Sequence, residues 1–250
     1  MKHVIIAAMM LTLLFTAHVQ AQELTALEIL QKTDEVGMAA QDQHSLSTMI
    51  LIDKDGDEKV RISEMFERVS EDMRLVRFLS PADQKGISFL TLPDDKMYIY
   101  LPAFKKIRTI ASHVKNENFA GTDFSYDDVG STTFSDDYDP ELLETTDEHY
   151  VLKLMPKPES EKDYGFLKIW VRKDIFFIIK TEYYDKGDNL WKIMDRRRIE
   201  KVGDKYWFAL EIEMTDVKKN HSTKNVTDTI EVDTGIKDSV FTQRNLKRIR

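Results

Sequence analysis

The stretch that decides the fold is residues 205–216, KYWFALEIEMTD. Every second side chain in it is apolar, and these positions are Tyr206, Phe208, Leu210, Ile212 and Met214. The side chains between the last of them are polar, namely Glu211, Glu213 and Thr215. Successive side chains of a strand point to opposite faces of a sheet, so this pattern predicts a strand with one apolar and one polar face.

The same period of two recurs along most of the chain, with Gly, Asp, Asn and Pro punctuating it about every eight to twelve residues. No helical pattern alternates with these segments, so a meandering antiparallel sheet of eleven or twelve strands is predicted. The expected strands are 45–52, 59–69, 73–80, 86–92, 96–101, 105–110, 149–155, 164–172, 175–184, 189–200, 205–216 and 225–232. A sheet of this many twisted strands curls. We therefore predict a mainly β (α+β) fold, an open and strongly curved half-barrel with a concave apolar face.

Two further segments are expected to cover that face. Thr25 and Glu28 have the spacing of a capping box, which predicts a helix from about Thr25. The other segment runs from Ser112 to Pro140 and carries the aromatic residues Phe119, Phe124 and Tyr126. A long connection without strands is often a lid, and Asp123 or Ser125 is the expected N-cap of a helical turn in it.

The chain begins with a segment that has the features of a signal peptide. Lys2 and His3 form a short basic start, 4–15 is an apolar run, and Ala21 is the small residue expected before a cleavage point. We predict cleavage after Ala21 and a single exported domain over 22–250.

Composition narrows the classes of function. The chain has 250 residues with 36 basic and 44 acidic side chains, for a net charge of −8. This acidic balance argues against a nucleic-acid partner held by phosphate contacts. The absence of cysteine excludes disulfides, so stability is expected to come from an apolar core.

Motifs for catalysis or metal binding are weak. Residues 53–58, DKDGDE, place glycine fourth rather than sixth and are read as a hairpin turn instead of a calcium loop. The histidines beyond the signal peptide are scattered and cysteine is absent, so no metal and no cofactor are expected. No G-x-S-x-G elbow occurs, and the least unfavourable nucleophile and base pair is Ser125 with His113.

The charged runs are expected on the surface. The acidic groups 127–128 and 136–139 are read as solvated surface. The basic runs 105–108 and 196–198 fall on predicted strands, where they either blunt an exposed edge or meet anionic lipid headgroups or an acidic partner.

Two blocks carry a family resemblance. They are residues 97–110, MYIYLPAFKKIRTI, and residues 118–128, NFAGTDFSYDD. In this order after a signal peptide, they resemble the outer-membrane lipoprotein-sorting family of LolA/LolB-like carriers, in its broader branch of exported proteins. The resemblance implies an open β-barrel whose capped concave face accepts acyl chains. It also implies a periplasmic location and an inner-membrane lipid transporter as partner.

The predicted function is a non-enzymatic periplasmic carrier that binds acyl chains of a lipid or lipidated protein and moves them toward the outer membrane, with transient contact to a membrane surface. Two small covers over a large concave sheet leave room for an apolar ligand. The candidate wall consists of Met97, Ile99, Leu101, Leu152, Leu154, Phe177, Ile179, Tyr206, Phe208, Leu210, Ile212 and Met214, and the candidate lid residues are Phe119, Phe124 and Tyr126. Two alternatives stay open: a lipid or ester hydrolase, and an envelope scaffold whose interior is fully packed.

Overall fold

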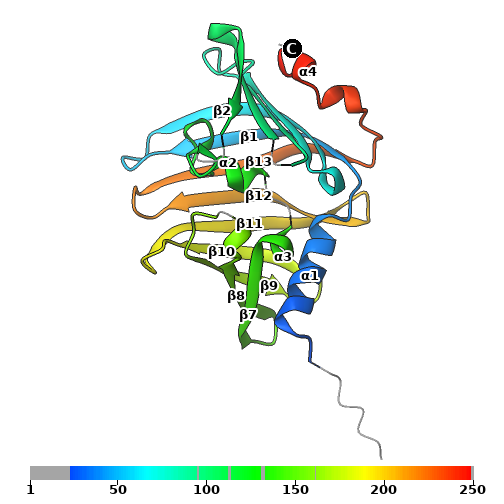
Figure 1. Cartoon of the computed structure of the whole chain (residues 1–250), viewed down its shortest axis with the longest axis vertical. Coiled ribbons are helices and arrows are strands. Elements are labelled where there is room, and N and C mark those ends of the chain that lie inside the picture. Colours follow the sequence, from blue (N-terminus) through cyan, green and yellow to red (C-terminus); the bar gives the residue numbers. More distant parts are fainter. Residues whose placement is uncertain (1–22, 95, 112–113, 131–132, 161, 249–250) are drawn as a thin grey trace, which may run out of the picture.

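The computed structural model describes residues 23–94, 96–111, 114–130, 133–160 and 162–248. Within them lies a single antiparallel sheet of 13 strands in the order β6-β5-β4-β3-β2-β1-β13-β12-β11-β10-β9-β8-β7. The sheet is open and curved, with helices and turns over its concave side (Figure 1). The predicted half-barrel is confirmed. The predicted signal peptide, 1–21, lies outside the described residues.

The strands are long at the centre of the sheet and shorter toward one edge. They are β1 (Gln43–Ile52), β2 (Glu58–Arg68), β3 (Met73–Ser80), β4 (Ser88–Leu92), β5 (Lys96–Leu101), β6 (Lys106–Ile110), β7 (Tyr138–Thr145), β8 (His149–Pro156), β9 (Phe166–Arg172), β10 (Phe177–Tyr184), β11 (Leu190–Val202), β12 (Tyr206–Asp216) and β13 (His221–Val232). The helices are α1 (Ala26–Gly37), α2 (Tyr126–Gly130), α3 (Phe134–Asp137) and α4 (Gln243–Leu246).

The sheet consists of two meanders joined through their first and last strands. Strands β1 to β6 form one meander and β7 to β13 the other, and β1 pairs with β13 at the middle of the sheet. Strands β6 and β7 consequently lie at opposite edges. The chain between them has to cross from edge to edge, and its described parts, 114–130 and 133–137, lie over the concave face. The lid is thus a consequence of the topology.

One strand was not predicted, because its sequence lacks a clean period of two. Strand β7 lies at the edge of the sheet and exposes most of its side chains. Its ladder with β8 is irregular between Leu142 and Glu144, which breaks the alternation. The lid expected over Ser112 to Pro140 therefore ends where β7 begins, at Tyr138.

Helix α1 begins as its capping box predicts. The backbone N–H of Glu28 donates to Oγ1 of Thr25 at 3.2 Å, and the N–H of Thr25 donates to the Glu28 carboxylate at 2.8 Å. Ile29 and Leu30 are fully buried on the side that faces the sheet. The helix and α3 lie over the lower half of the sheet in Figure 1.

Three apolar clusters hold the molecule together. The first lies between α1, α3 and strands β8 to β12, and includes Leu152, Ile169 and Met214. The second lies between the crossing segment and strands β1 to β6. The third joins the C-terminal segment, with Phe241 and Leu246, to Leu75, whose neighbour Val76 belongs to the second cluster. Because neighbouring strand residues face opposite ways, the C-terminus covers the convex side.

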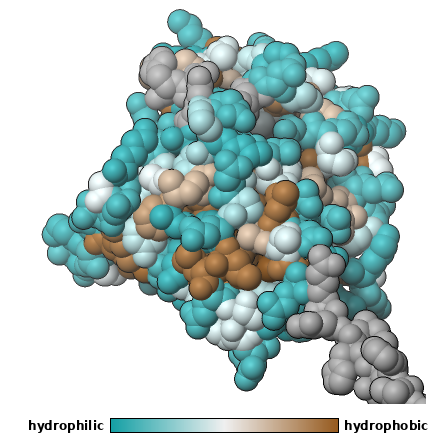
Figure 2. Space-filling model, turned by 60° about the horizontal axis from the view of Figure 1, so that its bottom comes forward, coloured by the Kyte–Doolittle hydropathy of each residue, from teal (hydrophilic) through white to brown (hydrophobic). Residues whose placement is uncertain are grey.

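The lower end of the molecule carries apolar surface. Figure 2 shows hydrophobic side chains gathered in a band on this face, bordered by hydrophilic ones. Exposed large apolar residues at the β7 edge include Leu142, Leu143 and Met155. Glu141 and Glu144 lie on the same edge strand, and charges at such positions oppose pairing with other chains. No helix within the described ranges is long and apolar enough to cross a membrane.

Candidate functional site

A cavity of about 400 Å³ lies under the covers of the concave face. Its wall is formed mainly by the central strands β11, β12, β13, β1 and β2, with parts of the crossing segment above them. The first apolar cluster fills the concave side toward β7, and the second fills it toward β6. The cavity is the space between these two packed regions.

Small side chains at the centre of the sheet keep this space open. Ser45, Ser47 and Ser63 line the cavity from β1 and β2, and Thr227 lines it from β13. In the strand register Ser47 lies opposite both Thr227 and Ser63, so three small polar side chains form a row across the floor. Larger side chains at these positions would fill the hollow.

The remaining wall is largely apolar. Strand β12 contributes Phe208, Leu210 and Ile212, which are only half-buried. Met49, Met65, Val76 and Met194 contribute further apolar surface, and the crossing segment adds Phe119 and Phe124. Methionine side chains adapt to differently shaped partners, which suits a wall that meets flexible ligands.

The floor also carries polar groups without protein partners. In the part of the chain that the structure describes, the side chains of Ser47, Ser63, Asn225 and Thr227 make no hydrogen bond to protein. These groups face the cavity between the apolar walls, so a ligand or water has to satisfy them. The cavity is therefore amphipathic.

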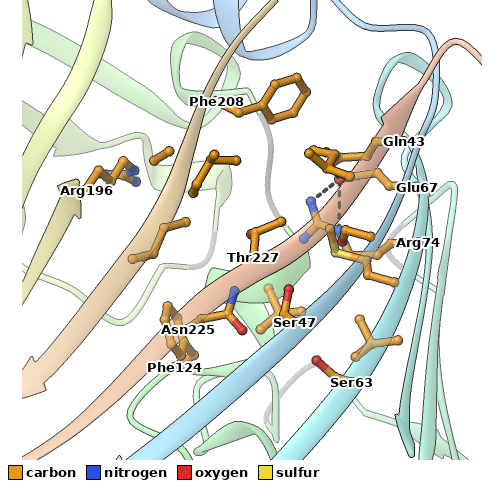
Figure 3. Close-up of a pocket in the computed structure, with 18 of the residues that line it drawn as sticks. Gln43, Ser47, Ser63, Glu67, Arg74, Phe124, Arg196, Phe208, Asn225 and Thr227 are labelled. Atoms are coloured by element: carbon orange, nitrogen blue, oxygen red, sulfur yellow. Dashed lines mark hydrogen bonds and ion pairs between the residues drawn. The ribbon is translucent and has the colours of Figure 1, made fainter. Parts of the chain in front are cut away.

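Charged side chains lie on opposite sides of the pocket (Figure 3). On one side, Nε of Arg74 donates to the Glu67 carboxylate at 2.8 Å, and Gln43 donates to the same carboxylate. On the other side, Nη1 of Arg196 donates to Oγ1 of Thr181 at 3.0 Å. Burial lowers the pKa of the Arg196 guanidinium, although an arginine stays protonated at any physiological pH.

The crossing segment is fastened to the sheet by a buried polar network around Asp128. The Asp128 carboxylate lies 3.5 Å from Nζ of Lys192 on β11 and accepts a hydrogen bond from the hydroxyl of Tyr164 at 3.1 Å. It also accepts from the backbone N–H of Ser125 at 2.7 Å. Oγ of Ser125 accepts from the N–H of Asp128 at 2.9 Å, as an N-cap does. The predicted capping role of Ser125 is confirmed.

A second anchor lies one turn earlier. The Asp123 carboxylate accepts a hydrogen bond from Oγ1 of Thr223 at 2.6 Å and lies 2.7 Å from Nδ1 of His221. Both partners are on β13. From β2, Nη1 of Arg61 donates to the carbonyl oxygen of Ala120 at 2.7 Å. The segment around Phe119 is thus held closed over the cavity by contacts to three strands.

Further along the segment, Lys162 bridges α2 and α3. Its Nζ lies 3.0 Å from the Asp127 carboxylate and 2.8 Å from that of Asp137. Burial raises the pKa of Asp127, and the carboxylates around Lys162 keep the pKa of that amine above its ordinary value against the effect of burial. The acidic groups read as solvated surface are therefore partly inside the molecule, where they order the lid.

The structure places the twelve predicted wall residues in two kinds of environment. Phe177, Phe208, Leu210 and Ile212 line the cavity. Met97, Leu152, Leu154 and Met214 are buried in the packed clusters, and Ile99 packs against the second of them. The last five residues do not reach the cavity.

The other three predicted wall residues also lie away from the cavity. The hydroxyl of Tyr206 donates to the Asp233 carboxylate at 2.6 Å. Ile179 is at an irregularity of the β9–β10 ladder, which moves Ile178 rather than Ile179 into the core. Leu101 ends β5 and is half-buried. Of the predicted lid residues, Phe119 and Phe124 line the cavity, whereas Tyr126 packs with Phe119 in the second cluster.

Sequence reasoning missed the polar part of the site. A signal was present in the sequence. Ser45 and Ser47 are two residues apart, so the strand period places both on one face, and Leu46 and Thr48 lie on the other. Arg196 likewise shares the face of Met194, two residues before it. Polar side chains at inward positions of a strand indicate a functional lining.

The weaker motifs have structural roles. Residues 53–58 form the predicted hairpin turn, in which the Asp53 carboxylate accepts from the N–H groups of Asp55 and Asp57. No group of three His, Asp or Glu side chains suited to a metal ion occurs among the described residues. Ser125 is buried and engaged as a cap, and His113 lies outside the described residues.

The architecture defines a class: an open antiparallel half-barrel with a covered, hollow concave face. A family model described as "Uncharacterized protein" matches residues 70–248, more than half of the chain. The chain belongs to that family, and the solved structures similar to it include an outer membrane lipoprotein-sorting protein domain, a DUF1329 family protein and a LolA superfamily protein. The resemblance seen in residues 97–110 and 118–128 is thereby confirmed. No curated protein sequence matches the chain.

Three solved structures illustrate the relationship. A Vibrio parahaemolyticus domain described as an outer membrane lipoprotein-sorting protein is 27% identical, with a TM-score of 0.81 over 89% of this chain and 98% of that one. A DUF1329 family protein from Desulfovibrio piger is 28% identical, with a TM-score of 0.82 over 88% and 97%. A LolA superfamily protein from Nitrosomonas europaea is 20% identical, with a TM-score of 0.74 over 89% and 100%, and shares the fold.

Proposed function

We propose that this protein is a non-enzymatic carrier that holds the acyl chain of a lipid or lipidated protein in its concave cavity. One observation carries the proposal: Phe208, Leu210 and Ile212 present half-buried apolar surface to a cavity of about 400 Å³ that the covers leave unfilled. Such a volume lies at the lower end of small-ligand pockets, about 300–1,000 Å³, and suits a single chain. A scaffold with a fully packed interior would have no such space.

The energetics suit transfer rather than storage. Burying an acyl chain yields about 0.8 kcal/mol per methylene, and a membrane offers nearly the same gain. A carrier therefore has to accept cargo without binding it much more tightly than the bilayer does. An adaptable methionine-rich wall with a partly polar floor meets this requirement.

The crossing segment is the proposed gate. Phe119 and Phe124 line the cavity, so the entry of a bulky chain moves them outward. This motion breaks the polar anchors of Asp123 and Asp128 while the sheet stays intact. A cover whose opening costs a few kcal/mol makes cargo exchange slow enough for transport and fast enough for release.

The location and partners form part of the proposal. The apolar run in residues 4–15 and the small residue Ala21 support export to the periplasm. The cargo would be collected at the inner membrane, where a lipid transporter is the proposed donor, and moved toward the outer membrane. The relative described as a lipoprotein-sorting protein domain supports this route.

The hairpin between β5 and β6 is the proposed contact surface for a membrane. Phe104 is 63% exposed at its tip, next to Lys105 and Lys106, in a chain whose net charge is −8. Arg108 lies over the Phe104 ring. An exposed aromatic side chain among basic groups can insert at an anionic lipid surface.

Native mass spectrometry of protein purified from a lipid-containing host tests the carrier function. The wild-type protein should carry lipid adducts, and Phe208→Asp should lose them because the new carboxylate would be buried among apolar groups. Val60→Asp is the matched control, since Val60 is an exposed apolar strand residue outside the cavity. Equal lipid loading of the Phe208 and Val60 variants would contradict the proposed site.

A further inference from the structure

One charge on the cavity wall has no counter-charge in contact with it. Arg196 donates a single hydrogen bond to protein, to the hydroxyl of Thr181. A guanidinium has five N–H donors, so about four of them have no acceptor in the described part of the chain. No carboxylate of the described residues lies within ion-pair distance of Arg196, whereas Arg74 across the pocket is paired with Glu67.

The nearest acidic groups are engaged elsewhere. Asp128 also lines the cavity, but its carboxylate is held by Lys192, the Tyr164 hydroxyl and the backbone N–H of Ser125. Asp195 precedes Arg196 in β11, so it points to the other face, where it pairs with Arg197 at 3.4 Å. The run of three arginines is thus divided between the two faces of the sheet.

Arg196 is half-buried at the cavity wall, and a partly desolvated charge without an ionic partner costs free energy, because the protein groups around it do not fully replace its hydration. Arginine cannot avoid this cost by losing its proton. The cost disappears when an anion enters the cavity and meets the guanidinium. The planar fork of Arg196 matches the oxygen atoms of a carboxylate or a phosphate in pairs.

Neighbouring side chains extend this anion site. Arg196 lies opposite Ile212 in the ladder, and Ile212 lies opposite Asn225. The free amide of Asn225 and the hydroxyls of Ser47 and Thr227 continue the polar surface along the floor. Apolar surface of Phe208 and Leu210 borders the same space, so a polar head and an apolar tail can be held together.

We propose that the cavity binds single-chain amphiphiles with an anionic head, a carboxylate or a phosphate monoester, and that Arg196 recognises the head. This inference rests on the proposed carrier function and names the ligand class of its cavity. The head group lies inside the protein and pairs with the guanidinium, while the tail lies along the β12 wall. The cavity then selects its ligand by charge as well as by length.

Three probes with the same unsaturated tail separate these contributions: oleate, oleyl phosphate and oleyl alcohol. Binding to the full protein, measured by calorimetry below micelle concentrations, should be at least about tenfold tighter for the two anions than for the alcohol. Arg196→Gln should lower the affinity for the two anions to that for the alcohol, because the charge contact is lost. The affinity for the alcohol itself should change by less than about twofold. Arg196→Lys keeps the charge and should retain part of the preference.

The outcomes distinguish the two proposals. If the wild-type protein binds all three probes equally, the anion site is refuted and the carrier function stands. If it binds none of them, the carrier function fails and the anion site fails with it. If Arg196→Gln weakened the binding of all three probes equally, Arg196 would have a structural role and would not recognise the head group. Whichever anion binds more tightly identifies the head group, and thermal melting of each variant confirms folding.

Discussion

Asp42 shows how single side chains direct the path of the chain. It precedes β1, and its carboxylate accepts hydrogen bonds from the N–H groups of Thr234, Gly235 and Ile236 at 2.8–3.0 Å and from the Thr234 hydroxyl. Burial raises the pKa of Asp42, but these hydrogen bonds outweigh it and hold the pKa below its ordinary value. The contacts fix the turn through which the chain leaves β13 for the convex side.

Replacing Asp42 with asparagine should lower the free energy of unfolding by about 2 kcal/mol at neutral pH, because a charged acceptor of several N–H groups is lost. Since the folded-state pKa is depressed, the stabilisation is fully present above the ordinary carboxyl pKa of about 3.9 and is lost as the pH falls through the lower folded-state value. Urea unfolding at neutral and acidic pH measures this. A difference between wild type and variant that is the same at both pH values would contradict it.

Two arginines, the buried Arg77 and the half-buried Arg196, differ in what holds them. Arg77 on the convex side lies 3.3 Å from the Glu64 carboxylate and donates to the Asn245 carbonyl at 2.9 Å. Arg196 has only the Thr181 hydroxyl. Breaking a buried ion pair leaves a charge without a partner, whereas removing an unpaired cation relieves a cost.

Arg77→Met should therefore lower the free energy of unfolding by about 3 kcal/mol, while Arg196→Met should change it by less than about 1 kcal/mol in ligand-free protein. Chemical denaturation of both variants checks the contrast. A large loss of stability in the Arg196 variant would show that the protein itself compensates this charge.

At the scale of elements, the β5–β6 hairpin combines an exposed aromatic side chain with basic side chains on an acidic protein. Its tip exposes Phe104 and carries adjacent lysines, and β6 forms the open edge of the sheet. The edge is basic where the opposite edge, β7, carries glutamates. This polarity orients the molecule relative to a negatively charged surface.

Reversing the charge of Lys105 and Lys106 to glutamate should abolish sedimentation with vesicles that contain phosphatidylglycerol, since each basic group near such a surface contributes about 1 kcal/mol. Wild-type binding should weaken as salt is added. The control is the same double change at Lys54 and Lys59, which flank another hairpin turn. Equal loss in the control would attribute binding to net charge rather than to the tip.

At the scale of the whole molecule, the lid and the sheet form one topological unit. Because β6 and β7 are the two edges, the segment between them has to pass from one edge to the other, and its packing against β1 to β6 places it over the cavity. Its anchors are the buried contacts of Asp123 with β13 and of Asp128 with β11. Gating therefore requires these polar contacts to break while both ends of the segment stay fixed.

A disulfide across the anchor between Asp123 and Thr223 tests this gate. The chain has no cysteine, so Asp123→Cys with Thr223→Cys creates a single thiol pair. Oxidation after loading with a fluorescent fatty acid should slow release to vesicles by more than about tenfold, and a reductant should restore it. The reduced form of the same variant is the control. Release that is unchanged by oxidation would exclude the crossing segment as the gate.

The sequence by itself determined the features that depend on near neighbours. The period of two in 205–216, the capping box of Thr25 and Glu28, the turn at 53–58 and the cap at Ser125 are all set by side chains within a few residues of one another. Strand β7 escaped prediction because an exposed edge strand needs no apolar alternation.

Only the tertiary structure decided how these elements combine. The pairing of β1 with β13 places β6 and β7 at opposite edges, and this pairing joins residues almost two hundred positions apart. Phe208 and Met214 have the same pattern in the sequence, yet one lines the cavity and the other is packed. The difference depends on which distant segments pack over each position, and a local pattern contains no information about such contacts.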